Sequence, residues 1–190
     1  MTKTALVIVD LQNDFCPGGS LAVPDGDRVV PVANRLIRRF QDAGLPVFAT
    51  RDWHPADHCS FKDQGGPWPP HCVQNTEGAR FHPSLNLPES ATIISKATTS
   101  EKDAYSGFDG TDLASRLRKT GTENIVVCGL ATDYCVKATV LDGLAEGLNV
   151  TVVEDGIRGV NVHPGDSRKA IDEMKKAGGT VLPEKDLTLR

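Results

Sequence analysis

The sequence has no long hydrophobic run. No segment approaches the about 18 unbroken apolar residues that a membrane-spanning helix needs. The apolar stretch near the start ends at Asp10, without the cleavage site of a signal peptide. We therefore expect a protein with no membrane partner.

The sequence also lacks a strong excess of charge of one sign and an even number of cysteines. The 21 basic and 25 acidic residues are interspersed and give a formal net charge of −4, so no basic stripe is available to bind nucleic acid. Five cysteines are an odd number, and a chain of this size does not need disulfide cross-links. A reducing compartment fits best, and we expect a cytoplasmic protein.

Six short apolar runs alternate with helix-like stretches along the 190 residues. The length and the 39% hydrophobic content predict a single domain over residues 1–190. The predicted strands are 4–10, 45–52, 91–96, 124–129, 149–155 and 179–182. The predicted helices are 27–43, 109–120, 133–147 and 165–177.

This alternation predicts an α/β protein with a three-layer, Rossmann-like fold. Strands joined by right-handed helical crossovers form a mainly parallel sheet, here six-stranded, with helices on its faces. The first strand leads into QNDFCPGGS rather than into a G-x-G-x-x-G turn, so a dinucleotide site is not supported.

Residues 53–90 interrupt the alternation. This long segment is rich in Pro, Gly and His and contains both tryptophans. A loop of this length inside a compact domain is usually functional or disordered, and its aromatic, Cys and His content argues against disorder. We predict a metal- and substrate-binding insert.

Chemically active residues follow the predicted strands. Asp10, Asp52, Lys96 and the segment GLATDYC all stand at or just beyond strand ends. Carboxyl ends of parallel strands are where open sheets bind ligands. A single such Asp could instead cap the next helix, but the coincidence of several indicates one shared crevice.

Cys135 stands in the first turn of a predicted helix, which Thr132 or Asp133 could cap. Backbone N–H groups and the helix dipole stabilise a thiolate there, and the ammonium of Lys96 would lower the thiol pKa further. Asp10 could accept the thiol proton and later pass it to a leaving amine.

The amides of Ala131 and Cys135 could then form an oxyanion hole. The alternative for Cys135 is a buried, inert thiol, which is the interpretation we prefer for Cys128 inside an apolar strand. Spacing alone favours neither interpretation of Cys135.

Asp52 and His54 are two residues apart and share a face of an extended chain, and His71 can return to them from the insert. Two imidazoles and one carboxylate leave positions open for water or substrate, as in a catalytic metal site. A structural zinc would need further protein ligands, and such ligands are available in His58, Cys59 and Cys72.

Aromatic residues could form a slot for a flat ligand. Trp68 is the better candidate to stack on such a ligand, and Trp53 suits a structural role. Phe15, Leu21 and Tyr105 could complete the slot, although each is equally plausible as core.

The chain resembles the nicotinamidases, within the isochorismatase-like cysteine hydrolases. The resemblance spans nearly the whole length and rests on these segments: ALVIVDLQNDFCPGGSLAV, TRDWHPADHCSF, GGPWPPHCVQNTEGA, SKAT followed by DAYSGF, and GLATDYCVKATVLDG. Each segment alone is of modest specificity, and together they are highly specific.

The resemblance implies hydrolysis of nicotinamide to nicotinate and ammonia through a thioester on Cys135, in NAD salvage, with pyrazinamide as a second substrate. It makes Asp10 the base and Lys96 the third member of the triad. It also implies a cis peptide at Leu130–Ala131, and a ring site between Phe15 and Trp68.

The resemblance further makes Asp52, His54 and His71 the ligands of one divalent ion that faces the pyridine nitrogen. Zinc is the first choice, with iron or manganese as alternatives. His58 follows His54 at a spacing that does not match relatives with an additional ligand, so it is left out of the metal set. Relatives are often homodimers or larger, and a homo-oligomer is compatible with this sequence.

Two other functions compete with this one. A sister amidohydrolase acting on ureido or carbamoyl compounds would share the triad but usually lacks the metal trio. A non-catalytic metal- or redox-binding protein would need only a reactive thiol, so it would not explain Asp10 and Lys96.

Overall fold

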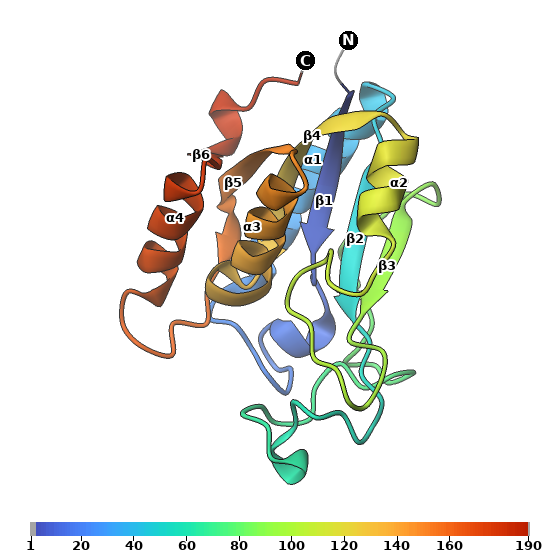
Figure 1. The fold of residues 1–190 in the computed structure, drawn as a ribbon, viewed down its shortest axis with the longest axis vertical. Helices are drawn as coiled ribbons and strands as arrows, with labels where there is room; N and C mark the ends of the chain where they lie inside the picture. Colours follow the sequence, from blue (N-terminus) through green and yellow to red (C-terminus); the bar gives the residue numbers. More distant parts are fainter. Residues whose placement is uncertain (1–2, 190) are drawn as a thin grey trace.

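The computed structural model describes residues 3–189, which form one sheet with helices on both faces (Figure 1). The strands are β1 (Lys3–Val9), β2 (Val47–Asp52), β3 (Thr92–Lys96), β4 (Thr122–Leu130), β5 (Asn149–Arg158) and β6 (Thr180–Leu182). Their order is β3-β2-β1-β4-β5-β6, and every neighbouring pair is parallel. The six predicted strands and the Rossmann-like α/β architecture are confirmed.

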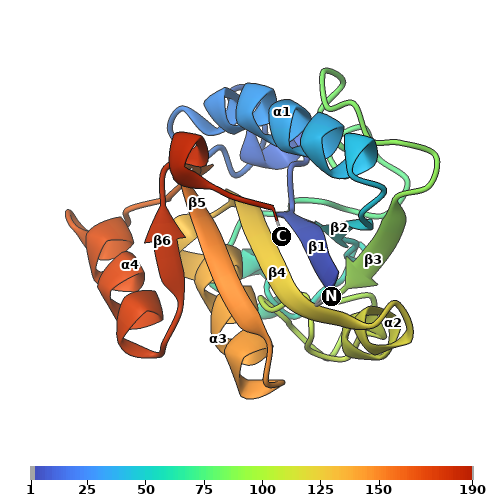
Figure 2. The ribbon, with the colours of Figure 1, turned by 90° about the horizontal axis from the view of Figure 1, so that it is seen from above.

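Four helices cover the sheet: α1 (Val29–Asp42), α2 (Leu113–Lys119), α3 (Lys137–Ala145) and α4 (Asp166–Lys176). Seen from above, α1 lies on one face, and α2, α3 and α4 lie on the other (Figure 2). The longest of them, α1, has 14 residues. None of the helices in residues 3–189 has the length and apolarity that a membrane crossing requires.

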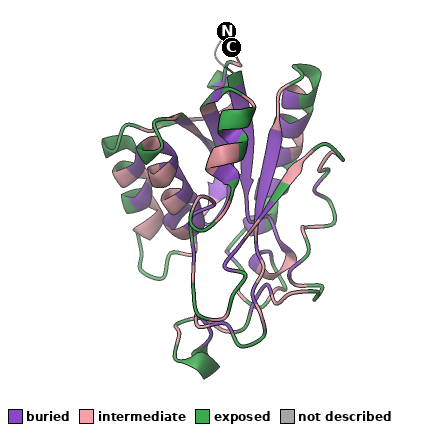
Figure 3. Cartoon of the chain, turned by 45° about the vertical axis from the view of Figure 1, so that its right-hand side comes forward, coloured by how far each residue is buried: buried purple, intermediate pink, exposed green. Residues whose placement is uncertain are grey.

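The apolar run of β1 explains why helices pack on both faces of the sheet. Leu6 and Ile8 belong to the core on the α1 side, whereas Ala5, Val7 and Val9 belong to the core under the other helices. Side chains alternate between the two faces of a strand, so a strand covered on both sides is apolar throughout. Figure 3 shows the central strands of the sheet as mostly buried.

The predicted helix 133–147 begins differently from expectation. A π-helical turn (Thr132–Val136) precedes α3, and the expected side-chain cap by Thr132 or Asp133 is not formed. The Asp133 carboxylate instead accepts hydrogen bonds from the backbone of Val160 and Asn161. A long-range contact has replaced the local cap.

The strand order places a topological switch point between β1 and β4. From β1 the chain proceeds through β2 to β3 on one side, and it then crosses back to β4, β5 and β6 on the other. Loops diverge at such a point and leave a crevice at the carboxyl ends of the strands. The predicted insert covers this end of the sheet (Figure 1). One 3-10 turn, Lys62–Gln64, is its only helix among the described residues.

Candidate active site

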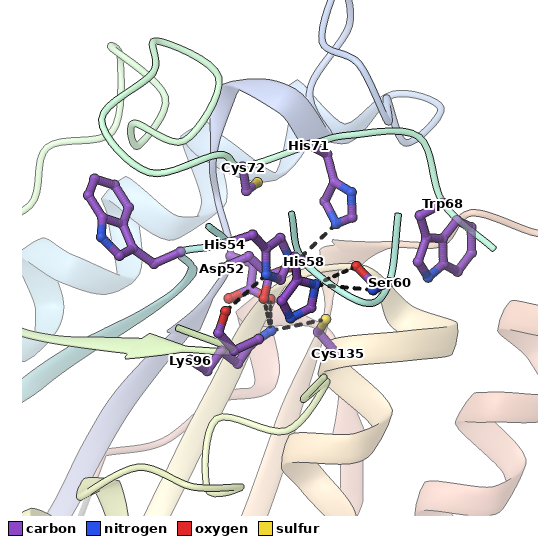
Figure 4. A network of polar contacts seen from close by, with 12 residues as sticks. Asp52, His54, His58, Ser60, Trp68, His71, Cys72, Lys96 and Cys135 are labelled. Atoms are coloured by element: carbon purple, nitrogen blue, oxygen red, sulfur yellow. Dashed lines mark hydrogen bonds and ion pairs between the residues drawn. The ribbon is translucent and has the colours of Figure 1, made fainter. Parts of the chain in front are cut away.

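Four strand ends bring predicted catalytic and metal-binding residues together, and Figure 4 shows three of them, Asp52, Lys96 and Cys135. Asp10 follows β1, Asp52 ends β2, Lys96 ends β3 and Cys135 lies in the turn after β4. Asp52 and Lys96 are register partners across the β2–β3 pair, so their side chains leave the sheet on the same side. The convergence that was expected from the strand ends is present in the structure.

Lys96 is the centre of the cluster. Its ammonium lies 3.0 Å from Asp10 Oδ2, contacts Asp52 Oδ1, and lies 3.5 Å from Cys135 Sγ. It also donates to the carbonyl oxygen of Ala104 at 3.1 Å. Burial lowers the pKa of this ammonium, but Asp10 and Asp52 raise it more, so the net pKa lies well above 10.5. Lys96 is therefore a fixed cation at neutral pH.

Asp10 has the properties of a proton acceptor. Its Oδ1 accepts a 2.7 Å hydrogen bond from Thr50, and its buried Oδ2 is paired with the Lys96 ammonium at 3.0 Å. Burial raises the pKa of Asp10, and the Asp52 charge adds to the effect while Lys96 opposes it. A base with a raised pKa holds a transferred proton better than an ordinary aspartate does.

The expected low pKa of Cys135 is wrong. Burial raises the pKa of the thiol well above 9.0, and the lowering by Lys96 is partly offset by Asp10 and Asp52. Helix-start amides and one ammonium do not outweigh desolvation beside two carboxylates. Cys135 therefore rests as a thiol, and a base has to remove its proton during reaction.

Two residues at the site have a left-handed backbone conformation. Asp10 has φ 47° and Ala97, directly after Lys96, has φ 50°. Non-glycine residues adopt this region at a cost of about 1–2 kcal/mol each, and such strain concentrates at functional sites. The turn at Ala97 directs its carbonyl oxygen to His54 Nδ1, at 3.1 Å.

Asp52, His54 and His71 form a donor set that fits one divalent metal ion. Their candidate ligand atoms lie within 4.8 Å of one another. His54 Nδ1 faces the Ala97 carbonyl oxygen and His71 Nδ1 faces that of Pro69, at 2.8 Å. In each ring Nδ1 thus faces a carbonyl oxygen, and Nε2 lies toward Asp52 Oδ2, at 3.5 and 3.9 Å. Carbonyl oxygens that accept a hydrogen bond from one ring nitrogen orient the other ring nitrogen of metal-binding imidazoles in this way.

Asp52 joins the two clusters, with Oδ1 on Lys96 and Oδ2 toward the histidines. Burial raises the pKa of Asp52, but Lys96 and His54 lower it more, and the net pKa lies below 3.8. Burial also lowers the pKa of His71 below 6.5. A permanently charged carboxylate and a neutral imidazole are the protonation states that metal binding needs.

The additional ligands of a structural zinc site do not join this trio. His58 stacks on His54 with ring centroids 4.1 Å apart, and its own nitrogens contact Ser60 Oγ at 2.7 Å and the Lys102 carbonyl oxygen at 3.1 Å. Among the described residues, neither Cys59 nor Cys72 falls within a metal-sized group. The site retains open positions, as a catalytic metal site requires.

A small pocket opens beside Cys135. Its wall includes all five predicted substrate-binding residues, Phe15, Leu21, Trp68, Tyr105 and Ala131, together with Asp52, His71 and Cys135. The peptide Leu130–Ala131 is cis, as the resemblance implied. Trp68 Nε1 donates a 3.0 Å hydrogen bond to the Tyr105 hydroxyl group. Trp53, outside the pocket, instead stacks under the Arg51 guanidinium at 3.8 Å.

Sequence reasoning missed three pocket residues, Val23, Tyr134 and Val160. Val23 and Val160 are apolar residues in loops and gave no signal. Tyr134 directly precedes Cys135, so its place in the GLATDYC segment was a usable signal.

Gln12 was also missed as a support of the site. Its fully buried amide accepts from Asp52 N at 2.8 Å and donates to the carbonyl oxygens of Asp52 and Ala79, at 2.8 and 2.9 Å. These bonds fix the backbone of Asp52 and attach the insert to it. A glutamine directly after an apolar strand was the available signal.

Comparison with known proteins gives consistent matches over most of the chain. The model of the family described as Isochorismatase domain matches residues 4–186. A nicotinamidase of Escherichia coli K12 is 48% identical over 202 residues, which cover 95% of each chain.

Two solved structures are similar along nearly their full lengths. A pyrazinamidase of Pyrococcus horikoshii in complex with zinc has a TM-score of 0.92 and 51% identity, covering 95% of this chain and 99% of that one. PnC1 of L. infantum in complex with nicotinate has a TM-score of 0.91 and 36% identity, covering 100% of this chain and 96% of that one.

Proposed function

This chain belongs to the isochorismatase domain family, and we propose that it is a nicotinamidase that hydrolyses nicotinamide to nicotinate and ammonia. The observation that carries the proposal is the position of Asp52, which contacts Lys96 of the Cys135–Asp10–Lys96 cluster and also faces His54 and His71. The nucleophile Cys135 and two members of the metal-binding trio, Asp52 and His71, thus line one pocket with aromatic walls. A flat ring that carries both a carboxamide and a metal-binding nitrogen suits this combination.

In the first half of the reaction, Asp10 takes the Cys135 thiol proton while sulfur attacks the carboxamide carbon. The carbon–sulfur bond forms, and the carbonyl electron pair moves onto oxygen. Amide groups of Ala131 and Cys135 stabilise this oxyanion. When the tetrahedral species collapses, the carbon–nitrogen bond breaks and Asp10 protonates the departing amine, which gives ammonia and a thioester.

In the second half, Asp10 is again a carboxylate and removes a proton from water. The water oxygen attacks the thioester carbon, and collapse breaks the carbon–sulfur bond. Asp10 returns the proton to Cys135, and the product leaves as nicotinate after its carboxyl group, which holds the second proton of the water, has released that proton to solvent. Lys96 stays charged throughout and holds the Asp10 carboxylate beside the thiol.

Asp52, His54 and His71 would hold one divalent ion, with zinc proposed first. When bound, such an ion supplies a Lewis-acid anchor for the pyridine nitrogen. The ring itself would pack between Phe15 and Trp68, both of which line the pocket, and this brings the carboxamide to Cys135.

Ammonia release from nicotinamide by the purified protein tests the proposal, with and without prior chelation and beside Cys135→Ala. We expect release that requires both the thiol and the metal. Absence of release from reduced, metal-replete protein would overturn the proposal and direct the search to ureido and carbamoyl compounds. Full activity of Cys135→Ala would exclude the thioester route.

The proposal also covers a second substrate, the cellular setting, the domain extent and the partners of the protein. Pyrazinamide has the same ring size and carboxamide, so we propose it as a second substrate, and we propose NAD salvage in the cytoplasm as the setting. We also propose one domain over residues 1–190, a small-molecule partner rather than nucleic acid or membrane, and compatibility with a homo-oligomer.

A further inference from the structure

Asp133 makes a long-range contact that the proposed reaction does not use. Its side chain is buried, two residues before Cys135. One carboxylate oxygen accepts a 2.9 Å hydrogen bond from Val160 N, and the other accepts a 2.7 Å bond from Asn161 N. Within residues 3–189 no lysine or arginine pairs with Asp133. Two backbone amides therefore balance a buried negative charge.

The segment after β5 is shaped around this carboxylate. Asn161 has φ 53°, and a left-handed residue allows successive N–H groups to converge on one anion. A Cβ atom at Gly159 would lie 1.8 Å from Ser167 Oγ and 3.0 Å from Asp133 Oδ1. A larger residue at position 159 would displace the Ser167 side chain at the start of α4 or the Asp133 carboxylate, so glycine suits this position.

The contact joins two parts of the substrate pocket. Asp133 lies on the π-helical turn that carries Cys135, and that turn also contains Tyr134 of the pocket wall. Val160, whose amide Asp133 holds, belongs to the same wall although it lies 27 residues away along the chain. The pairing of β4 with β5 ends at Leu130 and Arg158, and the Asp133 bond extends the connection beyond it, from the nucleophile turn to Val160.

We propose that Asp133 is a positioning residue, whose carboxylate fixes the Cys135 turn relative to the Val160 wall. The inference rests on the proposed nicotinamidase function for its substrate assay. Asp133 does not touch the reacting atoms in this role. It sets the distance between the nucleophile and the wall against which the ring packs.

The test compares Asp133→Ala and Asp133→Asn with the control Asp166→Ala. Asp166 also accepts one backbone amide in the connection after β5, from His163 at 2.8 Å, but it lies outside the pocket. We expect kcat/KM for nicotinamide, corrected for folded protein, to fall about tenfold or more in Asp133→Ala. Both a higher KM and a lower kcat should contribute.

The activity of Asp133→Asn distinguishes a positioning role of Asp133 from a role in stability alone. Asp133→Asn keeps one acceptor oxygen and should retain activity between wild type and Asp133→Ala. Asp166→Ala should match wild type. If Asp133→Ala keeps kcat and KM within about twofold of wild type and changes only the melting temperature, the role is structural and the inference is wrong. The same conclusion follows if Asp133→Asn is no better than Asp133→Ala.

A second measurement is independent of the substrate. The alkylation rate of Cys135 by iodoacetamide, followed on the Cys135 peptide by mass spectrometry, reports access to the thiol whatever amide is hydrolysed. We expect faster alkylation in Asp133→Ala and an unchanged rate in Asp166→Ala. Wild type that alkylates normally but releases no ammonia from nicotinamide would refute the proposed function alone. Equal alkylation rates in wild type and Asp133→Ala would refute the positioning role.

Discussion

Replacing Lys96 with methionine perturbs the charge balance of the buried cluster. The Lys96 side chain is 0% exposed and forms ion pairs with both Asp10 and Asp52. Methionine keeps most of the side-chain volume but leaves two buried carboxylates without their cation. Removing one partner of a buried ion pair costs about 3–5 kcal/mol. For a chain of this size, we expect the melting temperature to fall by roughly 6–20 °C.

The destabilisation should shrink in acid. Burial and the Asp52 charge already raise the pKa of Asp10 above the ordinary 3.8, and the loss of the opposing Lys96 charge raises it further in the folded variant. A carboxyl group with a raised folded-state pKa destabilises the fold above its unfolded pKa, and the penalty disappears as the pH falls through the raised value. The variant should therefore be closer to wild type at about pH 5 than at about pH 7.5.

Urea unfolding of the metal-free protein at both pH values measures this effect. The matched control is Lys102→Met, because Lys102 pairs with Asp109 at 2.6 Å but its side chain is 60% exposed. Exposed pairs contribute about 1 kcal/mol or less, so Lys102→Met should remain near wild type. A loss below about 1 kcal/mol in Lys96→Met at pH 7.5, or an equal loss at both pH values, would refute the reasoning.

Three further outcomes follow from the site. His71→Ala should bind the metal at least about tenfold more weakly and show a higher KM, and unchanged metal content and KM would refute the ligand assignment. The acid limb of kcat/KM should have its midpoint above 3.8, because burial raises the pKa of Asp10 and the carboxylate is the working form; a midpoint at or below 3.8 in a pH–rate profile would contradict that role. Cys135→Ala should keep its circular dichroism spectrum and lose about 1 kcal/mol of stability in urea, and an unfolded variant would show that the thiol is needed for packing.

Local patterns in the sequence determined the layers of this fold. The uninterrupted apolar run of β1 required burial on both faces, and the alternation with amphipathic stretches such as α1 required parallel strands joined by helices. Because parallel strands end at one edge, the positions of Asp10, Asp52 and Lys96 in the sequence also predicted that they meet. The amino-acid order alone therefore located the candidate site.

The tertiary structure decided the protonation states. Local features indicated a low thiol pKa at Cys135, whereas the folded protein buries that thiol beside Asp10 and Asp52 and raises the pKa. Desolvation depends on everything that packs around a group, so no local pattern reports it.

Long-range polar contacts also depended on the folded chain. Gln12 holds the backbone of Asp52, 40 residues away, and Asp133 holds that of Val160, 27 residues away. Such partners are adjacent only after the strands have been ordered. The sequence by itself indicated the candidate residues for the chemistry and determined at which edge of the sheet they gather. Only the tertiary structure decided how each is charged and what keeps it in place, because solvent exclusion and distant backbone partners arise from packing.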